Sequence, residues 1–315
     1  MAELMRLDEI RRLDVELEAR GALLHADSLL KPGVVSPGGV AVSGHDGYLF
    51  IGDGANRWER QYLGELTIAP SWTEAWRALF ARRQTEAAAR GVSLWNFVIP
   101  EKQVVYPEKR WGETLPNGDK RPLKQLMAGL DGTARLVYPD AALLAAKAPA
   151  PVYFRRNSHW TMSGCCAAME MLFLAMAVRL GAGGGFADVA FAVERHHAQH
   201  DLSVHFFATP PTEEFISLTT AGEVTDNNRR FELTGRHTGS SYVVRNSTAS
   251  DGRKVIVFGD SYGLDMGVTA ALSAVFAEVV FVWSKAVVWD LVARHAAQLV
   301  LWESAERYLA TVPEA

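Results

Sequence analysis

A serine that directly follows an apolar segment is the strongest candidate for a nucleophile in this sequence. Residues 255–258, Val-Ile-Val-Phe, are typical of a strand buried on both faces, and Gly259 ends the run. A glycine there allows a sharp turn that exposes Ser261 at the carboxyl end of the strand, where ligands of parallel sheets bind. Taken alone, the same residues also suit a turn in which Asp260 or Ser261 caps a helix, which we expect over residues 267–277.

A histidine lies in a comparable position earlier in the chain. His159 closes a segment, residues 153–161, that we expect to be the end of a second strand, and an alanine-rich helix is predicted after it over residues 163–177. An imidazole on a neighbouring strand end can take the proton of Ser261 during attack and return it to the leaving group. The ring needs a third group to hold it, and Asn157 lies two residues before it. A lone histidine would otherwise suit a surface or core position.

The two motifs together resemble those of a known family. Asn157-Ser158-His159-Trp160, followed later by Gly259-Asp260-Ser261-Tyr262, is similar to the motif pair of the SGNH hydrolase-like O-acetyltransferases typified by the alginate acetylation proteins AlgX and AlgJ. Residues 44–51, 99–102, 105–108 and 299–307 resemble further stretches of that family. Ordinary SGNH hydrolases carry the serine motif first, whereas this chain has the reversed order, as that acetyltransferase family does.

The resemblance implies a role for each of three residues. Ser261 would be the nucleophile, His159 the general base, and Asn157 would occupy the position where the family usually has an aspartate. An asparagine can accept a hydrogen bond from imidazole but cannot stabilise imidazolium by charge, and in a serine triad this change can cost roughly 10⁴-fold in turnover. The chain is therefore a slower enzyme, an enzyme with a substitute carboxylate, or a binding protein. The candidate substitutes are Asp260, Asp265 and Glu303.

Other residues are candidates for contacts with the substrate or its oxyanion. The backbone N–H of Ser261 would be one oxyanion donor, and Lys285 would add positive charge, although it also suits an exposed loop. The full set of oxyanion or substrate-binding candidates is Ser261, Lys285, Tyr106, Lys102, Trp160 and Glu303. Aromatic rings that can stack on sugars or serve packing are those of Trp58, Tyr106, Trp111 and Trp160.

Composition restricts the class of protein. The chain has 315 residues, 49% of them hydrophobic and 22% charged, which is enough to bury a substantial core. A net charge of −4 and the absence of a basic stripe argue against nucleic-acid binding. No apolar stretch approaches the roughly 20 residues of a membrane span. We expect no cofactor and no metal, and we interpret the cluster His196, His197, His200, Asp201 and His205 as solvated, since it lacks an HExxH pattern.

The pattern of elements predicts an α/β fold, a three-layer α/β/α sandwich around a mostly parallel sheet of about four or five strands. Residues 1–40 are expected to form an N-terminal helical arm, and residues 41–315 the SGNH-like domain, with an irregular excursion at about 195–246 that includes a short hairpin. Helices are expected over residues 71–90, 123–130 and 141–146, and strands over residues 92–99, 279–283 and 299–302.

The amino-terminal residues show no apolar core of a secretory signal, which favours the cytoplasm for the chain as it stands. The alternative is the periplasm, where the acetylation proteins of the family act, after removal of a signal. Cys165 and Cys166 are adjacent on a predicted helix, where a strained vicinal disulfide is disfavoured, so we expect buried thiols.

Together with the serine and histidine motifs, the resemblance implies transfer of an O-acyl group, in particular acetyl, to or from a hydroxyl of a carbohydrate through an acyl-serine. The partners would be an acyl donor, a hydroxyl-bearing acceptor such as a glycan, and other proteins of an acetylation machinery. A non-catalytic glycan-binding or assembly protein of the same fold and a simple carboxylesterase are the alternatives.

Overall fold

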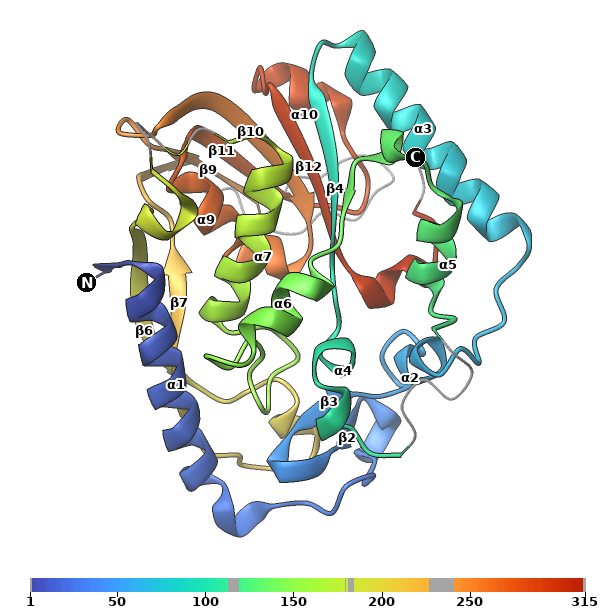
Figure 1. Cartoon of the computed structure of the whole chain (residues 1–315), viewed down its shortest axis with the longest axis vertical. Helices are drawn as coiled ribbons and strands as arrows, with labels where there is room; N and C mark the ends of the chain where they lie inside the picture. The colour runs from blue at the N-terminus through green and yellow to red at the C-terminus, as the bar shows by residue number, and fades with distance from the viewer. Residues whose placement is uncertain (1, 113–118, 179, 181–183, 227–240, 314–315) are drawn as a thin grey trace.

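A seven-stranded sheet forms the centre of the protein (Figure 1). The computed structural model describes residues 2–112, 119–178, 180, 184–226 and 241–313. In spatial order the strands are β5 (Leu136–Val137), β4 (Ser93–Ile99), β12 (Leu299–Ala305), β10 (Asp251–Gly259), β11 (Phe276–Trp283), β9 (Ser241–Arg245) and β8 (Glu223–Asp226). The first five are parallel to their neighbours, and β9 and β8 extend the sheet in antiparallel fashion.

Helices cover both faces of this sheet, as expected for a three-layer α/β/α sandwich. One core contains α3 (Ser71–Ala89), α5 (Pro122–Gly129) and α10 (Trp289–Arg294). The other contains α1 (Leu7–Leu24), α6 (Asp140–Ala146), α7 (Met162–Ala175) and α9 (Val268–Ser273). The short helices are α2 (Trp58–Tyr62), α4 (Lys102–Val105) and α8 (Ser261–Leu264).

Both faces of the central strand β10 are apolar, so a helical layer is needed on each side of the sheet. Val255 and Val257 lie in the core with α7, while Ile256 and Phe258 lie in the core with α3. All four side chains are fully buried. Because successive side chains of a strand point to opposite faces, an uninterrupted apolar run requires apolar cover on both sides.

Several sequence predictions of local structure were wrong. Residues 153–160 are no strand but a tight loop, closed by an isolated bridge between Tyr153 and Trp160. The helix expected over residues 267–277 is shorter than predicted, since α9 ends at Ser273 and β11 starts at Phe276, and the separate short helix α8 precedes it at Ser261. The sheet has more strands than expected because the short β5 was not predicted and because β8 and β9, which belong to the excursion, join the central sheet.

The excursion after α7 is more regular than predicted. Strand β6 (Phe191–Ala198) pairs with β7 (Glu213–Thr219) and with β1 (Glu3–Met5) in a separate three-stranded antiparallel sheet. Residues 227–240 of the excursion lie outside the described residues. A further small sheet pairs β2 (Ala41–Ser43) with β3 (Leu49–Ile51).

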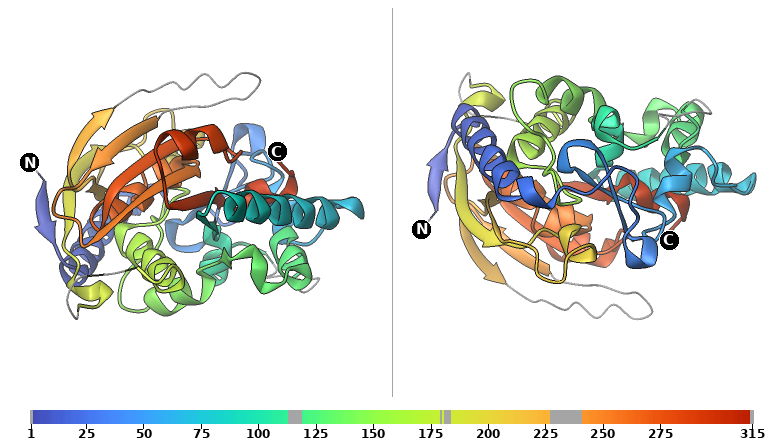
Figure 2. Two further views of the ribbon diagram at one scale, coloured as in Figure 1. Left: turned by 90° about the horizontal axis from the view of Figure 1, so that it is seen from above. Right: turned by 90° about the horizontal axis from the view of Figure 1, so that it is seen from below.

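The amino-terminal helix α1 packs against the core of the protein. Its buried side chains Leu7, Ile10, Leu13 and Leu17 join the core that contains α7. Asp14 Oδ2 accepts hydrogen bonds from the backbone N–H and the hydroxyl of Ser163, each at 2.6 Å, at the start of α7. Figure 2 shows α1 beside the yellow strands of the three-stranded sheet. The two cysteines of α7 are buried free thiols, as expected.

The contact between α7 and the loop before it generates a stability prediction. A Cβ on Gly164 would lie 2.1 Å from the carbonyl oxygen of Val152, so Gly164→Ala cannot be accommodated without moving this loop. We expect a loss of about 1–3 kcal/mol in the free energy of unfolding, measured by urea denaturation. The matched control is Gly252→Ala, where no atom lies within 4 Å of the added methyl group. Equal stability of the two variants would contradict the prediction.

Candidate active site

Ser261 lies where β10 ends and α8 begins. Asp260 caps this helix, because its Oδ1 accepts the N–H of Tyr262 at 3.0 Å. Glu303 Oε2, from β12, accepts the N–H groups of Asp260 and Gly263, both at 3.0 Å. A Cβ on Gly263 would lie 2.5 Å from the ring of Phe281, so glycine is required for this tight turn. The turn is therefore fixed from two neighbouring strands, and its serine stays partly exposed.

His159 reaches this serine from the loop before α7. Its Nε2 lies 2.8 Å from Ser261 Oγ, and its Nδ1 lies 2.7 Å from Asn157 Oδ1. The amide oxygen carries no proton, so Nδ1–H is the donor and Nε2 is free to accept the hydroxyl proton of Ser261. Asn157 Oδ1 also accepts the backbone N–H of His159 at 3.0 Å. The structure thus brings the three predicted catalytic residues together in the order that nucleophilic catalysis needs.

A family comparison agrees with this geometry. The sequence model of the family described as SGNH hydrolase-like domain, acetyltransferase AlgX, matches residues 41–306. The chain belongs to this family. Comparison with curated proteins finds no match.

Solved structures show the same fold at low sequence identity. PatB1 of Bacillus cereus, solved with a sulfonyl adduct, has a TM-score of 0.60 at 14% identity, covering 85% of this chain and 95% of that one. A DHHW family protein from Eubacterium siraeum has a TM-score of 0.59 at 15% identity, with 90% and 96% covered. The O-acetyltransferase domain of Pseudomonas putida AlgJ has a TM-score of 0.53 at 19% identity, with 87% and 93% covered.

This member of the AlgX-type family has a carboxylate near the histidine that sequence reasoning did not select. Asp201 Oδ2 accepts the hydroxyl of Ser158 at 2.5 Å and lies 3.7 Å from His159 Nδ1. Asp201 Oδ1 accepts the backbone N–H of Ser158 at 2.7 Å, and the Ser158 hydroxyl lies 3.3 Å from His159 Nδ1. Asp201 therefore supplies negative charge beside the imidazole without occupying the position of Asn157. In the sequence it belonged to the cluster of histidines that we interpreted as solvated.

The three carboxylates proposed from the sequence as substitutes are engaged elsewhere. Asp260 accepts backbone N–H groups with both oxygens, from Tyr262 and from Ala305. Glu303 is buried beneath the serine turn, and burial and then the charge of Asp260 raise its pKa well above the usual range, which favours its neutral form. Asp265 is exposed and lines a separate pocket.

Four of the predicted substrate contacts are buried and serve the structure instead. Lys102 Nζ donates to the carbonyl oxygens of Phe154, Arg155 and Asn157 at 2.9, 3.1 and 2.7 Å, and burial lowers its pKa to about 7. Lys102 therefore shapes the loop that carries His159 and does not face solvent. The others are Tyr106, whose hydroxyl accepts the N–H of Val152, Trp160, whose indole N–H donates to Met266, and Glu303.

The two remaining oxyanion candidates, Ser261 and Lys285, are accessible. The N–H groups of Asp260, Tyr262 and Gly263 all donate to carboxylates, whereas the N–H of Ser261 has no acceptor in the part of the chain that the structure describes. Lys285 is exposed, with its Nζ 4.2 Å from the centre of the Tyr308 ring. Partial burial and the charge of Arg307 lower the pKa of Lys285, and Asp260 opposes this effect.

The aromatic residues considered for sugar stacking mostly serve packing. Trp58 and Trp160 are fully buried, Tyr106 is nearly so, and Trp111 packs against Phe50 at a ring distance of 5.9 Å. Trp58, Tyr106 and Trp160 therefore offer little surface on which a sugar could stack, whereas Trp111 is partly exposed.

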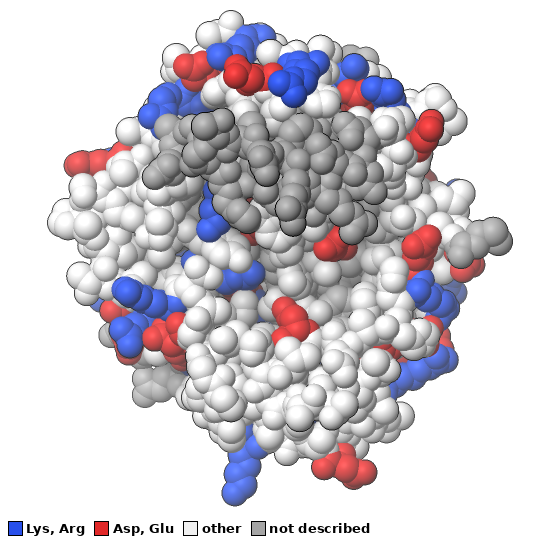
Figure 3. Space-filling model, turned by 180° about the vertical axis from the view of Figure 1, so that it is seen from behind, with Lys and Arg blue, Asp and Glu red and all other residues white. Residues whose placement is uncertain are grey.

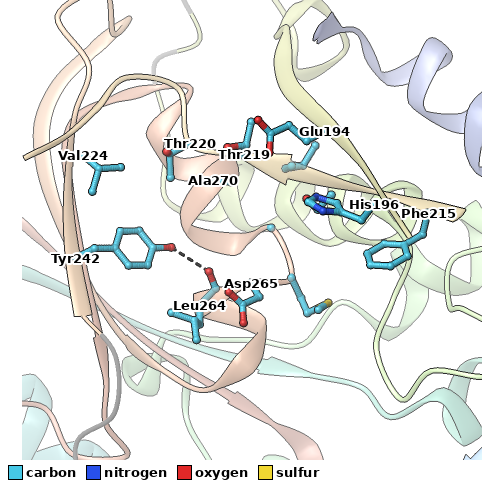
Figure 4. A pocket seen from close by; sticks show the side chains of 14 residues that line it. Glu194, His196, Phe215, Thr219, Thr220, Val224, Tyr242, Leu264, Asp265 and Ala270 are labelled. Carbon is cyan, nitrogen blue, oxygen red and sulfur yellow. Dashed lines mark hydrogen bonds between the residues drawn. The ribbon is translucent and has the colours of Figure 1, made fainter. Parts of the chain in front are cut away.

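A pocket lined by both polar and apolar side chains lies beside the serine turn. It has a volume of about 540 Å³ and is lined by residues of β6, β7, β8, β9 and the segment after α8, including His196, Thr219, Tyr242 and Asp265 (Figure 4). The Tyr242 hydroxyl donates to the carbonyl oxygen of Leu264 at 3.0 Å. Ser261 and His159 are not among its lining residues, so this pocket is not where the proposed chemistry takes place.

Charges on the molecular surface are mixed. On the face shown in Figure 3, basic and acidic side chains alternate along the rim, and those drawn in colour form no continuous patch of one sign. Among the helices of the described residues, none is both long and apolar enough to span a membrane.

The surroundings of His159 generate a pH prediction. Burial lowers the pKa of His159 below the usual imidazole value of 6.5, the carboxylate of Asp201 opposes this, and Arg307 adds to the lowering. We expect NMR titration to give a His159 pKa below 6.5, so that the neutral form, which alone acts as a base, persists to lower pH. Asp201→Asn removes the opposing charge and should lower this pKa further. A higher pKa in that variant would contradict the assignment of Asp201, and His159→Gln identifies the resonance.

Proposed function

We propose that this protein transfers an O-acyl group, most naturally acetyl, to a hydroxyl of a carbohydrate through an acyl-enzyme on Ser261. The observation that carries the proposal is the 2.8 Å contact between His159 Nε2 and Ser261 Oγ, with Asn157 on the other ring nitrogen. Membership of an acetyltransferase family supports the nature of the acyl group. The carbohydrate acceptor is inferred from the same family.

Each step uses the same histidine. His159 takes the proton of Ser261 as the serine oxygen attacks the carbonyl carbon of the donor ester. The bond from that carbon to the leaving oxygen breaks, and the imidazolium returns the proton to that oxygen. The acceptor hydroxyl then attacks the acyl-serine and gives its proton to His159, which passes it to the departing Ser261 oxygen. The Ser261 N–H, joined by the positive charge of Lys285, would stabilise the oxyanion formed in each attack.

The carboxylate of Asp201 completes this assignment. During both attacks His159 becomes an imidazolium, and Asn157 offers it only a neutral dipole. Asp201, 3.7 Å from Nδ1, is the carboxylate placed to stabilise the positive charge. Its side chain is 42% exposed, so water weakens the interaction relative to that of a buried aspartate. We therefore propose a working but attenuated enzyme rather than a binding protein that has lost catalysis.

The nucleophile is tested by intact-mass analysis. Incubation with 4-nitrophenyl acetate should add the mass of one acetyl group to the protein, and neither Ser261→Ala nor His159→Ala should show this addition on the same time scale. Ser158→Ala retains the nucleophile and should still be labelled, more slowly, because Asp201 loses its link to the histidine. Labelling of Ser261→Ala at the rate of the unmodified protein would reject the mechanism, provided that circular dichroism shows both folds intact.

Transfer and hydrolysis are separated by the fate of the acetyl-enzyme. For a transferase, adding a neutral oligosaccharide such as cellohexaose, or an acidic one such as an oligomannuronate, should accelerate loss of the acetyl group. Equimolar acetylated oligosaccharide should form in the same period. A loss rate that is the same with and without sugars, with free acetate as the only product, would identify a carboxylesterase instead.

A further inference from the structure

The amide of Asn157 contacts a second histidine on its other side. Asn157 Nδ2 lies 3.1 Å from His200 Nδ1. An amide nitrogen only donates, so His200 Nδ1 must be unprotonated and His200 must carry its proton on Nε2. His200 Nε2 in turn lies 3.5 Å from Glu213 Oε2. Its surroundings therefore select the tautomer that can hold the Asn157 amide.

Glu213 is a buried carboxylate between two histidines. Its Oε1 lies 2.7 Å from His25 Nε2, at the carboxyl end of α1. Burial raises the pKa of Glu213, but the hydrogen bonds from His200 and His25 oppose this, and the pKa stays below the usual value. The carboxylate is therefore ionised at neutral pH and keeps a proton on the nitrogen of each histidine that faces it.

The packing around these groups is specific. His200 is buried between the rings of Phe154 and Phe215, at ring distances of 5.2 and 5.7 Å. A Cβ on Gly21 of α1 would lie 2.5 Å from Glu213 Oε2, so a glycine in the helix makes room for the carboxylate. The end of α1, the loop before α7 and the segment from His200 to Glu213 thus contribute to one chain of polar contacts, from Asn157 through His200 and Glu213 to His25.

We propose that His200 and Glu213 are positioning residues that fix the orientation of the Asn157 amide. With Nδ2 bound to His200, the oxygen of Asn157 faces His159 Nδ1 and keeps the proton there. A rotated amide would present N–H to His159 Nδ1, move the ring proton to Nε2, and remove the base that Ser261 needs. The consequence for catalysis rests on the proposed function, whereas the effect on the tautomer of His159 does not.

The contact with His200 fixes which end of the Asn157 amide faces His159, and an aspartate would not need such a contact. The two oxygens of a carboxylate both accept hydrogen bonds, so a carboxylate at position 157 would need no partner to orient it. The nearly isosteric oxygen and nitrogen of an amide are distinguished only by their partners. The backbone N–H of His159 favours the correct orientation, and His200 adds the acceptor for the other end of the amide.

The first test observes the tautomer directly. Two-bond ¹H–¹⁵N NMR spectra above about pH 7 should show the protein with the His159 proton on Nδ1. His200→Phe, which keeps a ring in the site, should shift a large fraction of His159 to the Nε2–H form. Glu213→Gln should do the same by releasing the tautomer of His200. An unchanged His159 tautomer in both folded variants would overturn the proposal.

The matched control is His196→Phe. His196 also packs on the ring of Phe215, at 5.4 Å, but its Nε2 faces Ser217 and not Asn157. We expect no change in the His159 tautomer. A shift as large as that in His200→Phe would mean that repacking around Phe215, not the hydrogen bond to Asn157, controls the site.

The second test is a cycle of substitutions with Asn157→Asp. In the chain that keeps Asn157, His200→Phe should lower the rate of Ser261 acetylation by at least about 10-fold, within the roughly 10⁴-fold limit of a wrong tautomer. In the Asn157→Asp variant the same change should cost less than about threefold, because a carboxylate needs no orientation. Equal losses in the two backgrounds would indicate a merely structural role and would overturn the proposal.

The two proposals can fail separately. If Ser261 is never acetylated but the His159 tautomer responds to His200→Phe only in the chain that keeps Asn157, the proposed function is wrong and the positioning role stands. If Ser261 is acetylated and the tautomer ignores His200, the positioning role is wrong and the proposed function stands.

Discussion

The candidate site depends on one hydrogen bond, from His159 Nδ1 to Asn157 Oδ1. This bond decides which nitrogen of the ring faces Ser261 without a proton. In a triad with an aspartate, one side chain supplies both direction and charge. Here the two tasks are divided, because Asn157 gives direction and Asp201, bound through Ser158, gives charge from 3.7 Å away. The tautomer and the stability of the imidazolium can therefore be altered independently.

The loop that carries these residues has little regular structure of its own. A single bridge closes it, and the buried ammonium of Lys102 binds three of its carbonyl oxygens. The carbonyl oxygen of Arg155 also accepts the backbone N–H of Leu49 at 2.9 Å, so Lys102 adds to the few backbone hydrogen bonds that this loop makes. Gly164 of α7 lets the loop approach the helix closely. Rigid neighbours thus position the histidine, which explains how a loop outside the sheet can meet the serine at the end of β10.

The central elements were predictable from sequence because their signals are local. The apolar run of β10 indicated a doubly covered strand, and the spacing of Trp72, Trp76 and Phe80 indicated α3. The pairing of His159 with Ser261 was accessible because two motifs, not one, matched a family. Lys102 was predicted to contact the substrate, but it is buried and binds the loop that carries His159. Sequence alone did not reveal this burial.

The supporting residues could not be found in this way because their partners are far apart in the chain. His200 and Asp201 lie in a polar segment whose pattern resembles a solvated loop, yet one becomes buried against Phe154 and the other binds Ser158. Glu213 can bind His25 only because β7 packs against α1. The hydrophobic periodicity of the sequence does not predict these contacts, because they depend on how the three-stranded sheet packs beside the central one.

The division of tasks has a chemical consequence. A charge held at a distance and partly in water stabilises the imidazolium less than a buried aspartate in contact would, so the histidine is a weaker base. Because this stabilisation is weak, burial and the charge of Arg307 prevail and keep His159 neutral at lower pH. With asparagine in place of aspartate, acyl transfer is therefore expected to be slower, but the base stays unprotonated over a wider pH range. That exchange is useful only if the amide cannot rotate, which is why the buried chain through His200 to Glu213 matters as much as the carboxylate nearest the ring.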